Sequence, residues 1–192
     1  MSKETKKISL NSKILRFLLI PTISLVTPFF YPIQDANAGL EFQWNQNSGF
    51  KSLRWLQKQN KKRFKNKIYF FLRSFERNAE LLKINLVVPK PFKSTLKTEK
   101  ISLCKVKIGG FEDRTKCLED IPADIEITSN ESSLRSIDIY PYKPIPNNKD
   151  NYAIVLKVNN PNKSGLFQFH SYGQYKGNSV SSYLGSWTIV ID

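Results

Sequence analysis

The stretch DIEITSNESSLRSIDIYP, residues 124–141, decides the fold class of this chain. Ile125 and Ile127 alternate with polar residues, and Ile137 and Ile139 repeat the alternation after the polar run SNESS. Side chains at every second position of a strand lie on the same face, so each run has one apolar face and one polar face. Two such runs joined by a short polar segment predict an antiparallel β-hairpin.

The same pattern of short apolar runs between turn-rich polar stretches recurs from Lys51 to the C-terminus, and no stretch keeps a helical period. About nine strands at this spacing are typical of a β-sandwich, so we expect one all-β domain, an antiparallel β-sandwich, over residues 50–192. The run KIYFFLR is apolar on both faces, which indicates a central strand. The expected strands are 51–57, 67–73, 83–89, 102–108, 124–128, 136–141, 151–158, 165–174 and 182–192.

The first 38 residues have the parts of a secretory signal peptide. A basic start precedes the apolar run FLLIPTISLVTPFF, residues 17–30, and Ala36-Asn37-Ala38 offers the small residues that a signal peptidase needs, so we expect cleavage after Ala38. The alternative is an uncleaved membrane anchor, but the apolar run would be only about 21 Å long as a helix, against a hydrocarbon core of about 30 Å. The basic residues are Lys3, Lys6, Lys7, Lys13 and Arg16.

Cleavage there would leave residues 39–49, rich in Asn and Gln, as a flexible N-terminal arm before the domain. No later segment approaches the length of a membrane span, so we expect no transmembrane segment in the mature chain. The signal therefore predicts export from the cytosol.

Cys104 and Cys117 are the only cysteines, and His170 is the only histidine. This set cannot complete a tetrahedral zinc site, and a redox-active pair usually has C-x-x-C spacing. In an oxidising compartment such a pair can form a disulfide, so we expect a Cys104–Cys117 bridge that stabilises the fold by about 3 kcal/mol in the chain-entropy model. Because Cys104 and Val106 alternate with lysines, we also expect them to face the core.

The chain is strongly basic, with 30 Lys and Arg residues against 16 Asp and Glu residues. The densest basic stretch is KQNKKRFKNK, residues 58–67. Since export excludes nucleic acid as the expected partner, these cations would meet an anionic lipid surface, a cell-wall polymer or an acidic protein face. The alternative is a solvated connection between two strands. The candidate contact residues are Lys58, Lys61, Lys62, Arg63, Phe64, Lys65 and Lys67.

The sequence assigns no catalytic, cofactor-binding or metal-binding residue. His170 is opposite in phase to the neighbouring phenylalanines, so we expect it on the outer face of its strand. No nucleophile elbow accompanies it. Acidic residues in or beside the segment between the two cysteines could serve a hydrolase that acts on cell-envelope polymers near His170, or could bind calcium, although the interleaved basic residues indicate internal pairing. These acidic residues are Glu112, Asp113, Glu119 and Asp120.

Three stretches carry a resemblance to a known family. They are LCKVKIGGFEDRTKCLEDIPADIEI, residues 103–127; DIYPYKPIPNNKDNYAIVLKVNNPNKSGLFQFHSYGQ, residues 138–174; and YLGSWTIVID, residues 183–192. Together with the signal and the order of the strands, they resemble the cyanobacterial family called domain of unknown function 2808 over residues 50–192. The ending SSYLGSWTIVID is the most specific part, and the cysteine pair resembles a marine branch of the family.

This resemblance implies an exported, immunoglobulin-like domain located in the periplasm, the cell envelope or a thylakoid lumen. It brings no catalytic residue because the family has no assigned activity. Fold analogy alone supplies no function. From the sequence we therefore expect an exported, non-enzymatic binding or structural module that contacts an anionic partner through the basic stretch, with a cell-envelope hydrolase as the alternative.

Overall fold

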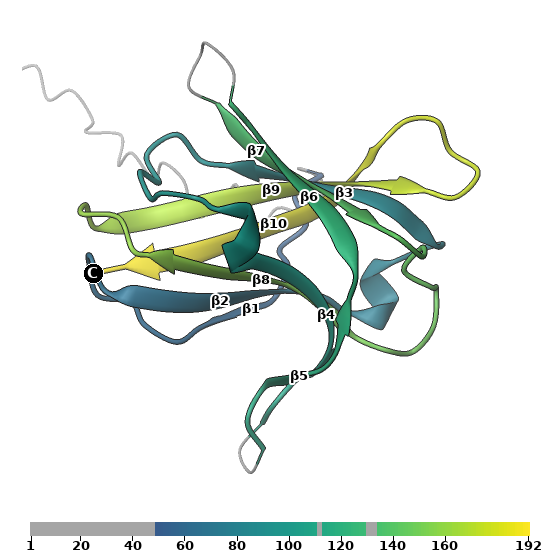
Figure 1. Ribbon diagram of the computed structural model, residues 1–192, viewed down its shortest axis with the longest axis horizontal. Coiled ribbons are helices and arrows are strands. Elements are labelled where there is room, and N and C mark those ends of the chain that lie inside the picture. Colours follow the sequence, from purple (N-terminus) through teal and green to yellow (C-terminus); the bar gives the residue numbers. More distant parts are fainter. Residues whose placement is uncertain (1–48, 111–112, 130–133) are drawn as a thin grey trace, which may run out of the picture. The chain divides into compact units, whose positions relative to one another are not determined.

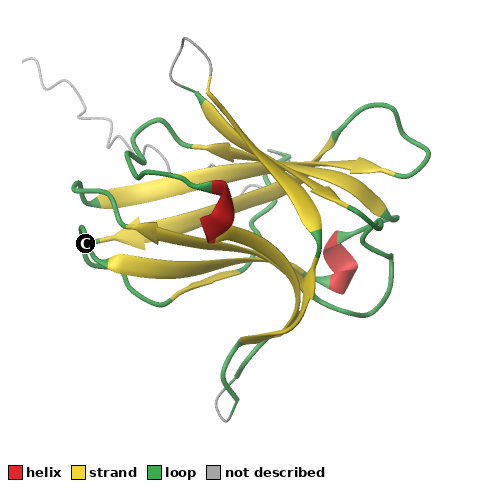
Figure 2. Cartoon of the chain, in the orientation of Figure 1, coloured by secondary structure: helices red, strands yellow, loops and turns green. Residues whose placement is uncertain are grey.

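The computed structural model describes residues 49–110, 113–129 and 134–192, and within them the chain forms ten strands and two short 3₁₀ turns (Figures 1 and 2). The predicted signal peptide and residues 39–48 of the predicted arm lie outside the described residues. The strands are β1 (Trp55–Gln57), β2 (Lys65–Leu72), β3 (Leu81–Val88), β4 (Ile101–Lys107), β5 (Lys116–Ile121), β6 (Ala123–Ser129), β7 (Arg135–Pro141), β8 (Tyr152–Asn159), β9 (Gly165–Tyr175) and β10 (Ser182–Ile191). The 3₁₀ turns are η2 (Ser74–Glu76) and η3 (Thr98–Lys100).

The strands form two five-stranded antiparallel sheets. The first sheet has the order β1-β2-β8-β4-β5 and the second has the order β10-β9-β3-β7-β6. Only Pro122 separates β5 from β6, so the chain passes there from one sheet directly into the other. The predicted immunoglobulin-like antiparallel sandwich is therefore confirmed, as is the central position of β2.

The core lies between the sheets and is built around aromatic rings. The Phe70 ring centroid is 4.9 Å from that of Trp187 and 5.0 Å from that of Phe169. The buried indole nitrogen of Trp187 donates to the backbone carbonyl of Phe71 at 3.2 Å, which ties the second sheet to the first. Aromatic pairs in these geometries contribute about 0.5–1.5 kcal/mol beyond the burial of their area.

The hairpin expected from the alternating isoleucines is confirmed. Ile125 lies opposite Ile139 and Ile127 lies opposite Ile137 in the β6–β7 pair. Ile137 and Ile139 are fully buried, and their partners on the edge strand pack against the same core. Cross-strand apolar pairs of this kind are the unit of sheet stabilisation.

Cys104 is fully buried, as expected, but the prediction that it points into the space between the sheets is wrong. The preceding residues Ile101 and Leu103 point into the space between the sheets, whereas Cys104 and Val106 belong to a separate buried cluster on the opposite face of the first sheet. The first sheet is apolar on both faces, so alternation with lysines did not identify the inner one. The predicted disulfide with Cys117 is confirmed, and it joins β4 to β5 on this outward face.

Candidate functional site

Two buried asparagines hold the loop between β1 and β2, which contains most of the predicted basic stretch. Asn66 is 5% exposed and Asn160 is 4% exposed. The side-chain oxygen of Asn66 accepts hydrogen bonds from the backbone N–H groups of Lys58 and Gln59 at 3.1 and 3.0 Å. The side-chain nitrogen of Asn160 donates to the carbonyl oxygens of Gln59 and Lys61 at 3.1 and 2.8 Å. Buried side-chain bonds of this kind fix a loop that has few partners in either sheet.

Arg63 ends this loop in an uncommon backbone conformation. Its φ of 64° lies in the left-handed region, where a residue other than glycine carries a cost of roughly 1–2 kcal/mol. Backbone contacts hold it there, because its N–H donates to the Pro161 carbonyl at 3.3 Å and the N–H of Asn160 donates to the Phe64 carbonyl at 2.9 Å. The loop is thereby held against the turn that follows β8.

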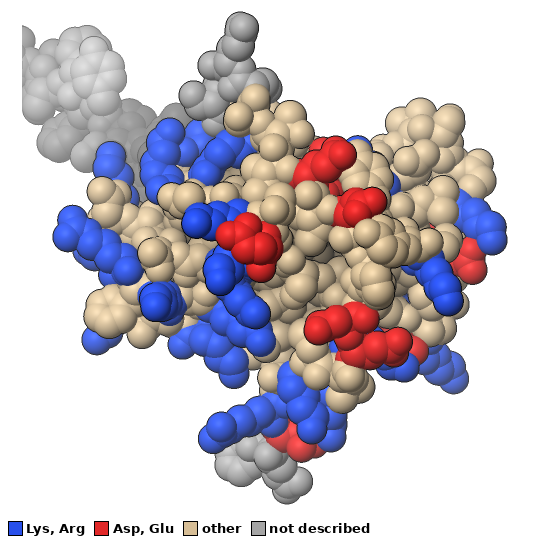
Figure 3. All heavy atoms as spheres, viewed as in Figure 1, with Lys and Arg blue, Asp and Glu red and all other residues tan. Residues whose placement is uncertain are grey.

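Beside this loop lies a hollow that we call the basic groove. It consists of two adjoining hollows of about 380 and 360 Å³ that share Thr95 and Asn159 in their lining. No Asp or Glu is among the described residues that line it. In the face shown in Figure 3, Lys and Arg predominate at the left, the end where the C-terminus lies, and most Asp and Glu lie to their right. The basic residues that line the groove are Arg63, Lys65, Lys93, Lys97, Lys100 and Lys157.

These six cations come from three separate segments: the end of the β1–β2 loop with the first residue of β2, the connection between β3 and β4, and the end of β8. Among the ion pairs of the described residues, none joins any of the six to a carboxylate. Like charges so arranged raise the local potential and attract an anion, most effectively at low ionic strength.

Of the predicted contact residues, only Arg63 and Lys65 line the basic groove. Phe64 is 56% exposed beside them. Lys67 is half-buried on the outward face of β2, with its ammonium 4.8 Å from the centroid of the Tyr69 ring. The other predicted residues are exposed in the loop but outside the lining; they are Lys58, Lys61 and Lys62.

The lysines of the β3–β4 connection and of β8 were not among the contact residues predicted from the sequence. The connection carries Lys93, Lys97 and Lys100, a spacing that could have marked it as basic. Lys157 stands alone in an apolar strand, and only the pairing of Lys67 with Lys157 across β2 and β8 brings it to this end of the sheet.

The family model described as "Protein of unknown function (DUF2808)" matches residues 47–191. The chain belongs to this family. The predicted membership of this family is thus confirmed. Within the ending YLGSW of this chain, close packing restricts position 185 to glycine. Gly185 has a φ of 144°, and a Cβ on it would lie 2.6 Å from the Leu53 Cγ and 2.7 Å from the Lys51 carbonyl oxygen, where the chain passes beside β10.

Among curated proteins, none matches this DUF2808 chain. Solved structures that it resembles include the collagen-binding domain of a Staphylococcus aureus adhesin, with 12% identity, a TM-score of 0.38 and coverage of 72% of this chain and 95% of that one. The collagen-binding subdomain of the Enterococcus faecalis surface protein ACE is 6% identical, with a TM-score of 0.41 and coverage of 73% and 97%. AvmM, titled as a macrocyclization catalyst in alchivemycin A biosynthesis, is 11% identical, with a TM-score of 0.36 and coverage of 74% and 90%. Likenesses this distant transfer no function.

A second hollow of about 430 Å³, which we call the proline pocket, lies against the Pro-rich connection between β7 and β8. Its lining includes Pro144, Ile145 and Pro146 of that connection, together with Lys105 and Asp150, which form an ion pair at 2.8 Å. The hydrogen bond to Asp150 raises the pKa of the Lys105 ammonium.

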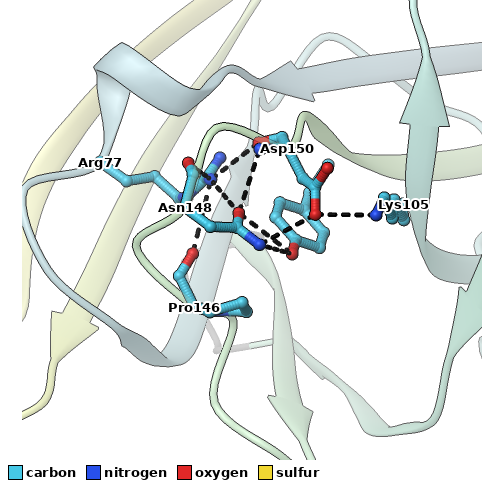
Figure 4. A network of polar contacts seen from close by, with 6 residues as sticks. Arg77, Lys105, Pro146, Asn148 and Asp150 are labelled. Carbon is cyan, nitrogen blue, oxygen red and sulfur yellow. Dashed lines mark hydrogen bonds and ion pairs between the residues drawn. The ribbon is translucent and has the colours of Figure 1, made fainter.

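Arg77 anchors this connection, and its side chain points toward Asn148 and Asp150 (Figure 4). The side chain is 3% exposed and donates to the carbonyl oxygens of Leu72, Asn148 and Asp150 at 2.7, 3.1 and 2.8 Å. Its guanidinium carbon lies 4.7 Å from the centroid of the Tyr152 ring. Burial lowers the pKa of Arg77, yet the carbonyl contacts satisfy the charged form. Arg77 therefore acts as an internal brace of the Pro-rich connection.

The acidic residues proposed for a hydrolase do not come together in the described part of the chain. Glu119 and Asp120 line the proline pocket, but they are neighbours on β5, and neighbouring strand residues point to opposite faces. The Nζ of Lys107 lies 2.7 Å from the Oδ2 of Asp113, and this hydrogen bond lowers the pKa of the Asp113 carboxyl. Glu112 is outside the described residues.

His170 lies on the outward face of β9 in the second sheet, as predicted from its phase. Its Nδ1 is 2.7 Å from the hydroxyl oxygen of Ser186, which is fully buried and also lies 2.6 Å from the Tyr183 hydroxyl. A buried hydroxyl held by two partners cannot reach a substrate, so this contact is structural.

The cysteine pair does not form a metal centre with its acidic neighbour. A carboxylate oxygen of Asp120 and the sulfur atoms of Cys104 and Cys117 lie within 4.8 Å of one another. The sulfur atoms are joined in a disulfide and offer no thiolate to a metal ion.

Among the described residues, no helix is long and apolar enough to cross a membrane.

Proposed function

We propose that this chain is an exported, non-enzymatic binding module that holds an anionic partner in the basic groove. The observation that carries the proposal is the convergence of six cations from three segments on one groove whose described lining has no carboxylate. Anions that fit this description are a charged polymer of the cell envelope, an anionic lipid surface or an acidic protein face.

Two further observations support the proposal. Export is consistent with the disulfide, because such bonds persist in oxidising compartments, and with the signal-like N-terminus of the sequence. A non-enzymatic role is favoured because His170 lies on the outward face of β9 in the second sheet, whereas Asp113 and Glu119 belong to the β4–β5 hairpin of the first sheet. The asparagine-held loop gives the groove a fixed shape, so little ordering is needed when a partner binds.

The test compares two variants that lose the same charge. The groove variant carries Arg63→Gln, Lys65→Gln, Lys97→Gln and Lys157→Gln, and the control variant carries Arg114→Gln, Lys116→Gln, Lys143→Gln and Lys149→Gln at exposed positions outside the groove. The probes are a dextran sulfate resin and phosphatidylglycerol vesicles.

We expect the groove variant to leave both probes at clearly lower salt than the control variant, because only the groove variant loses clustered charge. If the parent chain binds the vesicles but not dextran sulfate, the groove is a site for a lipid surface. If the parent chain binds dextran sulfate but not the vesicles, the groove is a site for a polymer. Equal loss in both variants would mean that net charge alone causes retention, which would refute a groove-based site.

A further inference from the structure

The ring of Phe64 is an exposed apolar group that stands among the cations of the basic groove. It is 56% exposed and lies in the sequence between Arg63 and Lys65, both of which line the groove. The cations alone would account for the binding of an anionic polymer, and they leave the ring without a role. Aromatic rings beside lysines and arginines are typical of protein surfaces that dock on anionic lipid.

The exposure of this ring does not come from a loose loop. The carbonyl of Phe64 accepts a hydrogen bond from the N–H of Asn160 at 2.9 Å, and the preceding residue, Arg63, is held at a φ of 64° by its bond to the Pro161 carbonyl. A strained backbone persists only where the surrounding structure fixes it, and such positions cluster at functional sites. The fold therefore presents the ring to solvent from a fixed backbone.

The ring lies at an end of the sandwich where three basic segments meet. The β1–β2 loop, the β3–β4 connection and the β8–β9 turn all lie at the end of the strands where the C-terminus lies (Figure 1), and cations gather there in the face shown in Figure 3. Glu99 is the one acidic residue of these three segments. Their basic residues are Lys58, Lys61, Lys62, Arg63, Lys90, Lys93, Lys97, Lys100 and Lys163.

Two further apolar side chains are exposed at this end. Leu166 and Val190 are cross-strand partners on β9 and β10, and they are 63% and 38% exposed. The loop before Phe64 is joined to the residue after β10, because the N–H of Lys62 donates to the Asp192 carbonyl at 3.0 Å. Each of the pair is one residue from the end of its strand, a distance of about 3.3 Å, and apolar groups enter a lipid interface to a depth of about 5–10 Å.

We propose that this end of the sandwich docks on an anionic lipid bilayer, with the Phe64 ring inserted among the headgroups and the lysines and arginines of the three segments placed against lipid phosphates. A bilayer presents its negative charge as a plane, so cations spread over three segments at one end can meet it together. The inference rests on the proposed function, because the basic groove supplies part of the charge, and it selects the lipid surface from the anions considered there.

The test compares Phe64→Ser with Phe75→Ser, which remove the same exposed ring from opposite ends of β2. Phe75 lies in η2, directly after β2; it is 70% exposed, and the guanidinium carbon of Arg73 lies 4.3 Å from its ring centroid. Each variant is the whole chain as secreted by an exporting bacterial host, so the N-termini of the variants are the same. The probes are phosphatidylglycerol vesicles and a dextran sulfate resin.

We expect Phe64→Ser to bind the vesicles about tenfold more weakly than the parent chain, because the ring no longer contributes apolar burial. Its retention on dextran sulfate should be unchanged, and Phe75→Ser should match the parent chain on both probes. Equal vesicle binding by the two variants would overturn the inference and leave the basic groove as an anion site. A parent chain that binds dextran sulfate but not vesicles would do the same, whereas a parent chain that binds neither would refute the proposed function as well.

A second measurement detects insertion of the ring directly. Phe64→Trp and Phe75→Trp are mixed with phosphatidylglycerol vesicles whose acyl chains carry bromine, which quenches tryptophan fluorescence only at close range. We expect Phe64→Trp to be quenched more than the parent chain, and Phe75→Trp to be quenched as the parent chain is. If Phe64→Trp is quenched no more than Phe75→Trp, the ring at position 64 does not enter the bilayer and the inference is wrong.

Discussion

The side-chain nitrogen of Asn66 donates a 2.9 Å hydrogen bond to the side-chain oxygen of Asn160, and this buried pair joins residues 94 positions apart in the sequence. Asn66 lies in β2, and Asn160 follows β8. Each asparagine also binds the backbone of the loop before Arg63, so one pair sets the position of two walls of the basic groove.

Replacement of Asn160 by Ala should therefore weaken both the fold and the groove. The carbonyl oxygens of Gln59 and Lys61 and the side-chain nitrogen of Asn66 would lose their partner, and buried polar groups left without one cost about 1–3 kcal/mol. We expect the free energy of unfolding in urea to fall by that amount and retention on dextran sulfate to weaken. Asn178→Ala, at an exposed position between β9 and β10 and outside the groove lining, is the control and should leave both unchanged. If the Asn160→Ala variant is retained on dextran sulfate as strongly as the parent chain, the position of the loop does not determine binding.

Replacement of Gly185 by Ala should destabilise the domain by about 2 kcal/mol or more, because the left-handed backbone is strained for alanine and its Cβ would overlap Leu53. Gly177→Ala is the control, since Gly177 also has a positive φ, of 89°, but a Cβ there would meet nothing within 4 Å. Thermal unfolding of the two variants gives the comparison. If Tm falls by a similar amount in both variants, backbone strain alone, without the close approach of Leu53, explains why alanine destabilises position 185.

Removal of the disulfide should cost about 3 kcal/mol, since the bridge restricts the unfolded chain. The variant Cys104→Ser with Cys117→Ser should unfold at lower urea than the parent chain, and a reducing agent should shift the parent chain but not the variant. Thiol titration of the unfolded, unreduced parent chain should find no free thiol. Titration of two thiols would mean that the bridge does not form in the purified protein.

Nine of the ten strands of the described residues could be predicted because their signal is local. The sequence KCLEDI of β5 (Lys116–Ile121) lacks a clear alternation, and this strand was not predicted. Ile125, Ile127 and their partners on β7 show the alternation within a few residues, and β2 shows apolar residues on both faces. The assignment of Cys104 to the core failed for a related reason. When both faces of a sheet are buried, alternation marks two faces but does not say which is inner.

The groove could be predicted only in part, because its lysines meet through sheet pairing. Lys65 and Lys157 come together when β2 pairs with β8, and Lys97 joins them from the β3–β4 connection. Nothing local to Lys157 distinguishes it from an ordinary exposed lysine. The asparagine pair that shapes the loop is equally non-local, so the sequence indicated basic charge but not its location.

The binding site can be located by titrating the isotopically labelled chain with a dextran sulfate oligosaccharide and recording the amide NMR shifts. If the basic groove holds the anion, the largest shifts fall on Thr95, Lys97, Lys157 and Asn159, and they diminish as salt is added. Largest shifts at the proline pocket or over the β4–β5 hairpin, or the absence of any saturable shift at low salt, would show that the groove is not the binding site.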